Sequence, residues 1–118
     1  EVLDKAGLLL EHFEISDRAD HKPGELSTGQ KQRTALARAL INNPRLILAD
    51  EPTGNLDRQN AKVVMEHLRQ IADAGAAVLI VTHDVEIENM TANHLRLDKG
   101  VIVEHAESVP VQKNVVKS

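Results

Sequence analysis

The chain has 118 residues, of which 42% are apolar and 1% aromatic, so it is long enough for one domain with a core of aliphatic side chains. Its formal charge of −4 and the lack of a dense Lys/Arg cluster argue against a surface that neutralises nucleic-acid phosphates. Cysteine is absent, which excludes disulfides, thiolate metal sites and thiol catalysis and fits a reducing compartment.

The first part of the chain predicts two helices joined by a polar loop. Apolar residues recur every three or four positions between 2 and 13, as in a helix with one buried face. Residues 16–25 are polar and contain a Pro-Gly pair, which predicts an exposed loop. Ser27 and Gln30 have the spacing of a capping box, so a second helix should begin there, and Asn-Asn-Pro at 42–44 should end it.

Two short apolar runs then predict strands with polar residues at their carboxyl ends. Residues 46–49 are uninterrupted and end in two acidic residues, the pattern of a buried parallel strand that is covered on both faces. Residues 61–72 have helical spacing up to Gly75, and a second apolar run at 76–81 ends in Thr-His-Asp. A strand, a helix and a second strand make up a βαβ unit.

The connection in such a unit is right-handed and puts both strand ends on one edge of the sheet. Asp50, Glu51 and His83 are therefore expected to converge, at the edge where open sheets of this kind bind ligands. Residues 94–98 and 101–104 predict two further short strands around a Lys-Gly turn, followed by a weakly ordered tail.

Three stretches, in this order, resemble the motifs of the ATP-binding cassette (ABC) ATPase family: LSTGQKQRTALARAL at 26–40, LILADEPTGNLD at 46–57 and VLIVTHD at 78–84. The resemblance extends from about Leu8 to Glu104. Three ordered motifs with compatible spacing are much more specific than a lone Asp-Glu pair or a lone histidine.

The resemblance implies an α/β fold with a partial P-loop NTPase-like parallel sheet and flanking helices. It also implies three regions of the chain. Residues 1–43 form part of a helical subdomain with the signature motif, residues 44–104 form the carboxyl-terminal part of the ATPase core, and residues 105–118 are the tail.

The resemblance also implies a role for each residue at the strand ends. Asp50 would hold Mg²⁺, largely through water, and Glu51 would polarise the hydrolytic water as general base. Neighbouring residues of a strand point in different directions, so the two roles can be divided between them. His83 would donate a hydrogen bond to the γ-phosphate of ATP and sense its presence. The alternatives are a solvated acidic strand end and a structural histidine, and the other five histidines have no ligand-like spacing.

Ser27, Gly29 and Gln30 lie in the segment that resembles the signature motif, where Thr28 replaces the usual glycine. A helix N-terminus with free amides, a hydroxyl and a glycine suits a phosphate. The resemblance implies that this segment contacts the γ-phosphate of an ATP held by a second subunit, so that a dimer completes the active site. Asp57 resembles the loop residue that faces its counterpart across that dimer. A plain helix cap is the alternative for Ser27 and Asp57.

The phosphate loop of this family, Gly-x-x-x-x-Gly-Lys followed by Ser or Thr, does not occur in the 118 residues. The most similar string, at 24–31, has Gln30 before the lysine and no apolar strand in front of it. We therefore expect the chain to be the carboxyl-terminal half of a longer protein and to hydrolyse negligible ATP by itself.

The expected function is binding and hydrolysis of ATP, with Mg²⁺, to power transmembrane transport, most similar to the lipoprotein-release and macrolide-export type of cassette. The implied partners are a transmembrane permease subunit and a second ATPase subunit, at the cytoplasmic face of the cell membrane and without nucleic acid. One alternative is a non-transport ABC-type ATPase of DNA repair or translation. Another is a catalytically silent α/β interaction module in which Asp50 is a regulatory site.

Overall fold

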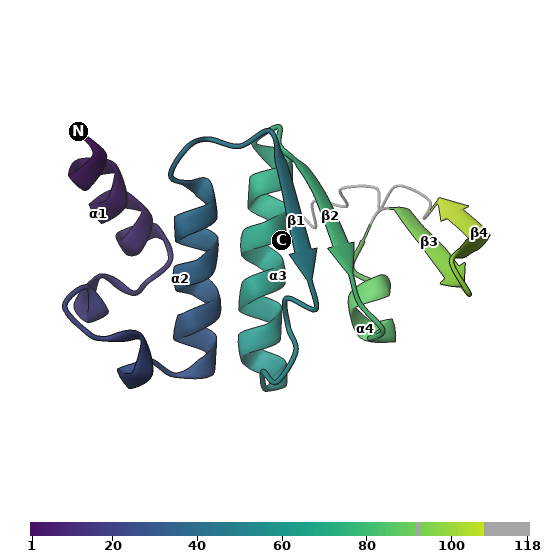
Figure 1. The fold of residues 1–118 in the computed structure, drawn as a ribbon, viewed down its shortest axis with the longest axis horizontal. Helices are drawn as coiled ribbons and strands as arrows, with labels where there is room; N and C mark the ends of the chain where they lie inside the picture. Colours follow the sequence, from purple (N-terminus) through teal and green to yellow (C-terminus); the bar gives the residue numbers. More distant parts are fainter. Residues whose placement is uncertain (92, 108–118) are drawn as a thin grey trace, which may run out of the picture. The chain divides into compact units, whose positions relative to one another are not determined.

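The computed structural model describes residues 1–91 and 93–107, and the chain divides into two compact units, Glu1–Thr82 and His83–Ser118. The first unit contains α1 (Val2–His12), α2 (Thr28–Leu40), β1 (Leu46–Asp50), α3 (Arg58–Asp73) and β2 (Ala77–Val81) (Figure 1). The second contains α4 (Val85–Glu88), β3 (Asn93–Asp98) and β4 (Val101–Glu107). No helix in the described ranges has the length and apolar character needed to cross a membrane.

The two strands of the first unit form the predicted parallel pair. Leu46 lies opposite Ala77 and Asp50 lies opposite Val81, and α3 connects the strands. Because both strands run in the same direction, their carboxyl ends lie at one edge of the sheet. The α/β fold and the βαβ unit are therefore confirmed.

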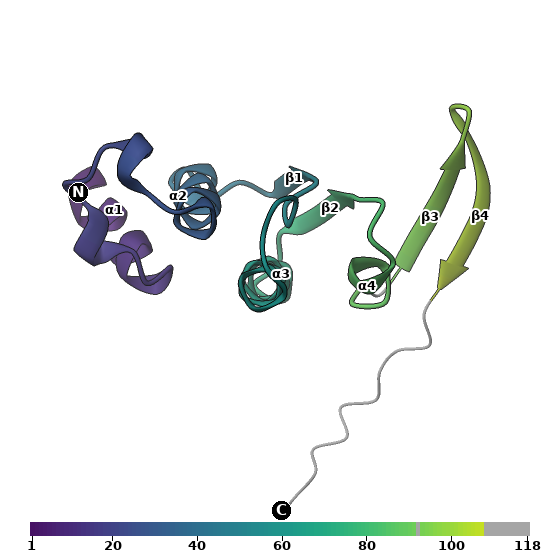
Figure 2. The same cartoon turned by 90° about the horizontal axis from the view of Figure 1, so that it is seen from below.

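One face of this sheet is covered and the other is exposed. Helix α3 lies against one face (Figure 2), and the alternation along β1 leaves Ile47 at 6% exposure and Leu48 at 70%. Leu79 of β2 is 53% exposed. The prediction of a strand covered on both faces is wrong here, because within residues 1–82 the structure packs one helix against one side of the sheet. An uninterrupted apolar run predicts burial but does not show which element provides the cover.

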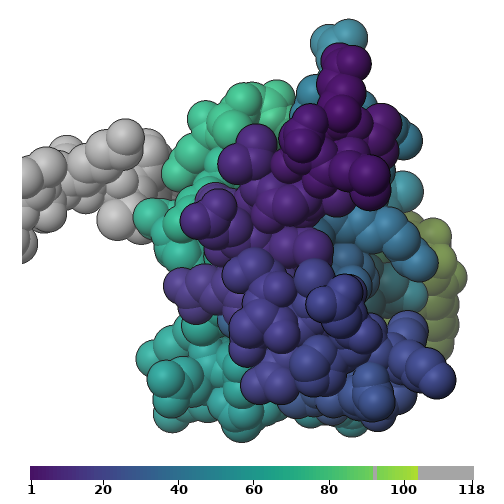
Figure 3. Space-filling view, turned by 90° about the vertical axis from the view of Figure 1, so that its left-hand side faces the viewer, coloured from purple at the N-terminus to yellow at the C-terminus, as the bar shows by residue number. Residues whose placement is uncertain are grey.

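The core of the first unit lies between the helices. Phe13, Ile15, Val64 and Leu68 are almost completely buried, and α2 packs against both α1 and α3. In the space-filling view of Figure 3, α1 and the residues after it occupy the side of this unit that faces the viewer. These contacts place residues 1–43 and the two parallel strands in the same compact unit. The division into a helical subdomain and a core at 43/44 stays a prediction.

The second unit contains the predicted strand pair. β3 and β4 are antiparallel, and the turn between them is made by Lys99 and Gly100, both with positive φ (47° and 80°). β4 continues to Glu107, so its backbone extends three residues into the range predicted as tail. Residues 108–118 lie outside the described part of the chain.

Candidate functional site

The carboxyl end of β1 positions two adjacent acidic residues. Asp50 is the last residue of the strand and is exposed, whereas Glu51 is half-buried. The Glu51 amide donates to the Val81 carbonyl at 2.8 Å, which extends the pairing of the strands by one residue. Glu51 has a φ of 45°, in the left-handed region that costs an ordinary residue about 1–2 kcal/mol. The neighbouring strand thus holds Glu51 in a strained turn, as often found at functional sites.

The side chain of Glu51 is held from the end of the second strand. The Thr82 hydroxyl donates to Glu51 Oε2 at 3.2 Å, and Thr82 directly follows β2. This hydrogen bond connects the two strand ends through their side chains and orients one carboxylate at the sheet edge. We did not predict Thr82 from the sequence, although it directly precedes His83 in the third motif.

A tight loop leads from Glu51 to α3. The Gly54 amide donates to the Glu51 carbonyl at 3.0 Å, and the Leu56 amide donates to the Thr53 carbonyl at 3.1 Å. A Cβ atom on Gly54 would lie 3.2 Å from the Glu51 carbonyl oxygen, so the turn favours glycine there. Thr53, which belongs to this loop, is buried. These turns place Asp57 immediately before the helix.

Asp57 is the N-cap of α3, as the cap alternative predicted. Its Oδ1 accepts from the amides of Gln59 and Asn60, at 3.0 Å each, and its Oδ2 accepts from Asn60 Nδ2 at 2.5 Å. The hydrogen bond from the Asn60 amide, followed by that from the Asn60 side chain, lowers the pKa of Asp57. The carboxylate is therefore ionised and held in place, and its role across a dimer stays a prediction.

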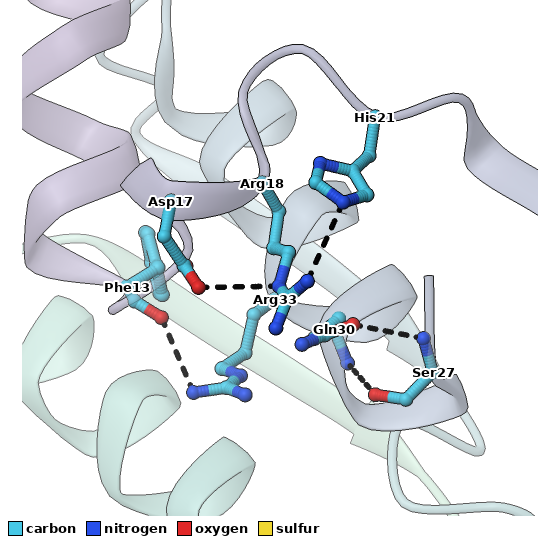
Figure 4. A network of polar contacts seen from close by, with 7 residues as sticks. All are labelled: Phe13, Asp17, Arg18, His21, Ser27, Gln30 and Arg33. Carbon is cyan, nitrogen blue, oxygen red and sulfur yellow. Dashed lines mark hydrogen bonds and ion pairs between the residues drawn. The ribbon is translucent and has the colours of Figure 1, made fainter. Parts of the chain in front are cut away.

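The signature-like segment begins α2 with the predicted capping box. Ser27 Oγ accepts from the Gln30 amide at 3.2 Å, and Gln30 Oε1 accepts from the Ser27 amide at 2.9 Å (Figure 4). Thr28 is the first residue of the helix, so threonine fits the helical conformation at this position. The cap alternative for Ser27 is thus confirmed, and contact with a phosphate stays a prediction.

Gly29 brings this segment against α3. Gly29 is buried, and a Cβ atom built on it would lie 2.9 Å from Asn60 Oδ1. Asn60 also donates to Asp57, so one side chain contacts both the signature-like segment and the loop before α3. We did not predict Asn60 from the sequence. Its position three residues after the cap is the signal that was available.

The residues directly after α1 are held against α2 one turn after its start. Arg33 Nη1 donates to the Phe13 carbonyl at 3.4 Å and lies 3.9 Å from Glu14 Oε2. Within the loop, Arg18 pairs with Asp17 at 3.2 Å (Figure 4). The Arg33 contacts connect the end of α1 to the helix that begins with the signature-like segment.

His83 is the first residue of the second unit. In that unit Asp84 caps α4 by accepting from the Glu86 amide at 2.9 Å. The structure thus brings Asp50, Glu51 and Thr82 together, and it places Ser27, Gly29 and Asp57 around α2 and α3. The position of His83 beside Glu51 stays a prediction.

Known proteins share this sequence and fold. A family model described as ABC transporter matches residues 2–54. The macrolide export ATP-binding/permease protein MacB of Bdellovibrio bacteriovorus is 50% identical over 99 residues, which are 84% of this chain and 15% of that protein. The lipoprotein-releasing system ATP-binding protein LolD of Treponema pallidum is 48% identical over 104 residues, which are 87% of this chain and 46% of that protein. The chain therefore matches part of an ABC transporter ATP-binding domain.

A solved ABC structure agrees with this assignment. The dimeric post-hydrolysis state of the ATP-binding cassette MJ0796, bound to ADP and Pi, aligns with a TM-score of 0.76 at 37% identity. The alignment covers 88% of this chain and 46% of that one. The chain therefore spans less than half the length of each of these ABC proteins.

Proposed function

We propose that this chain supplies the hydrolytic and dimer-contacting part of an ATPase that powers transport across a membrane. The observation that carries the proposal is Glu51, held in a left-handed turn at the carboxyl end of β1 with its carboxylate bonded to Thr82. Asp50 lies beside it at the same edge of the sheet. The names of MacB and LolD, which describe export and release systems, support a role in transport.

Two adjacent carboxylates at one sheet edge can divide the work of hydrolysis. Glu51 accepts a proton from the water that attacks the γ-phosphate, and the Thr82 hydroxyl keeps that carboxylate in one orientation. Asp50 is exposed at the strand end and would hold Mg²⁺. When bound, the ion would supply positive charge that stabilises the charge developing on the phosphate oxygens.

The residues present fit Mg²⁺ that arrives with a nucleotide. Among residues 1–91 and 93–107, no three His, Asp or Glu side chains form a group that could hold a metal ion. Mg²⁺ is commonly bound by one or two carboxylates together with waters and substrate phosphates, so a single Asp50 suffices.

The remaining groups complete the site in an assembly. His83 donates to the γ-phosphate, while Ser27, Gly29 and Gln30 contact the γ-phosphate of an ATP held by a second ATPase subunit. The phosphate loop belongs to an amino-terminal half that lies outside these 118 residues. A permease subunit binds the dimer at the cytoplasmic face of the membrane. The dimeric form of the cassette bound to ADP and Pi supports this assembly.

Reconstitution from two halves tests the proposal. The purified chain is mixed with a separately expressed half that carries the phosphate loop, and Mg²⁺-dependent ATP turnover is measured. We expect turnover from the mixture and negligible turnover from this chain alone. Glu51→Gln should lower kcat by about a hundredfold or more, because the amide cannot act as a base.

Glu66→Gln is the matched control, since Glu66 is an exposed acid on α3 that contacts the surface residues Arg69 and Gln70. It should leave turnover unchanged. A mixture without turnover, or one in which Glu51→Gln is as active as the parent chain, contradicts the proposed hydrolytic role. ATP turnover of the mixed halves that is stimulated by DNA, and not by membranes containing a permease, would favour a non-transport ABC-type ATPase.

A further inference from the structure

We propose that Asn60 is a positioning residue that holds the signature-like segment and the loop 55–57 of one subunit in a single fixed arrangement. The proposal rests on the proposed function, because that function gives both segments a contact with a second subunit. Asn60 lies in the first turn of α3, outside the capping box of Ser27 and Gln30 and outside the acidic pair.

The contacts of Asn60 run in two directions. Its Nδ2 donates to Asp57 Oδ2 at 2.5 Å, and its backbone amide donates to Asp57 Oδ1 at 3.0 Å. Its Oδ1 points toward Gly29, where a Cβ atom would lie 2.9 Å from that oxygen and 3.2 Å from Asn60 Cγ. The amide group therefore lies between the start of α2 and the carboxylate that caps α3.

The chemistry of this position requires asparagine. A carboxylate of the same shape cannot donate to Asp57 and would place two like charges side by side. A leucine of similar size has no donor for the Asp57 carboxylate. A side chain on Gly29 would have to displace Asn60, so each residue restricts the other.

The consequence is a mechanical link within one subunit. Asn60 bonds to the Asp57 carboxylate and faces the start of α2 with the other end of its amide. It therefore favours one relative arrangement of the phosphate-contacting segment and the dimer-facing loop. Each segment is also held by its own cap hydrogen bonds, and Asn60 adds a connection between the two.

The first test measures turnover in the assembly of this chain with its phosphate-loop half. Asn60→Ala should lower kcat by about tenfold, because the signature-like segment and the loop 55–57 would no longer be held in the orientation that catalysis needs. The affinity for ATP, measured separately by equilibrium binding, should stay within about twofold because the phosphate loop is in the other half. Asn60→Asp should lose as much as Asn60→Ala, whereas a residue that only fills space would tolerate it.

Gln59→Ala is the control for these variants. Gln59 carries an amide of similar size on the same turn of α3, is exposed, and contacts Asp57 through its backbone amide. It should keep the turnover of the parent chain. The positioning role is overturned if Asn60→Ala or Asn60→Asp keeps the kcat of the parent chain. It is also overturned if kcat and ATP affinity fall by the same factor.

The second test reads the contact without ATP. Gly29→Ala, Asn60→Ala and the double variant are compared by urea unfolding of the full chain. Gly29→Ala should be less favourable in the parent than in the Asn60→Ala background, because the added methyl group displaces the Asn60 side chain only in the parent. Additive effects would overturn the contact. If the assembly with the parent chain shows no ATP turnover, the proposed function itself is contradicted. If that assembly is active and Asn60→Ala has the same turnover, only this inference is contradicted.

Discussion

The Thr82 hydroxyl helps to orient the Glu51 carboxylate. Thr82 donates to Glu51 Oε2 at 3.2 Å from the end of the neighbouring strand. Thr82→Val keeps the shape of the side chain but removes the donor, so we expect kcat of the reconstituted assembly to fall by about tenfold. Thr82→Ser keeps the hydroxyl and should retain most of the activity. Equal turnover in the valine and serine variants would show that Thr82 does not orient the base.

The ring of His67 makes the first unit sensitive to acid. Its centroid lies 4.6 Å from that of Phe13, and its buried Nδ1 atom has no hydrogen-bond partner among residues 1–91 and 93–107. Burial lowers the pKa of His67 below the usual 6.5, and repulsion from His12 and Arg33 adds to this effect. Glu14 and Glu66 oppose it only partly.

Stability should therefore fall as the pH drops below 6.5, because the unfolded chain binds a proton there that folded His67 does not accept. The loss from this group is at most about 1.4 kcal/mol per pH unit. Urea unfolding from about pH 7.5 to about pH 5 should show a smaller pH dependence in His67→Gln than in the parent. His21→Gln, at an exposed histidine, is the matched control and should behave like the parent. An unchanged pH dependence in His67→Gln would exclude His67 as the cause.

The beginning of α2 has a structural and a proposed catalytic role, which substitution can separate. Ser27→Ala removes the acceptor for the Gln30 amide, and loss of such a cap costs about 1 kcal/mol of stability. Ser27→Asn should restore stability, since asparagine is a good N-cap. It should not restore turnover if the serine hydroxyl also contacts the γ-phosphate. Full activity of the asparagine variant would leave Ser27 with the cap role alone.

The helices, the strands and the parallel strand pairing of this chain could be predicted from local patterns, whereas the side-chain contacts between the elements could not. Helical spacing, the capping box at Ser27 and the breaker at 42–44 indicated where α2 begins and ends. Parallel pairing followed from two apolar runs with a helix between them. The contact between Gly29 and Asn60 joins positions 31 residues apart, and neither residue type signals a partner. Periodicity also cannot distinguish one covered sheet face from two, which is why the exposure of Leu48 was unexpected.

For the molecule as a whole, the exposed sheet face is where a second part of the protein is needed. A sheet of two strands is marginal by itself, and this one leaves Leu46, Leu48, Leu79 and Val81 at least half exposed. The chain aligns with less than half of each relative and solved structure that we compared. Under the proposed function, the half that carries the phosphate loop covers this face, and burial of these side chains stabilises the assembly of the two halves.

Leu48→Glu tests this arrangement because Leu48 is 70% exposed in the chain as described but would be buried by the second half. A leucine contributes about 1.5–3 kcal/mol on burial, and an unpaired carboxylate in its place adds a desolvation cost. We expect Leu48→Glu to abolish turnover of the mixed halves and to reduce self-association of this chain in sedimentation velocity. Leu3→Glu is the matched control, since Leu3 on α1 is 85% exposed, and it should change neither measurement. Parental turnover in Leu48→Glu would mean that this sheet face stays uncovered in the active assembly.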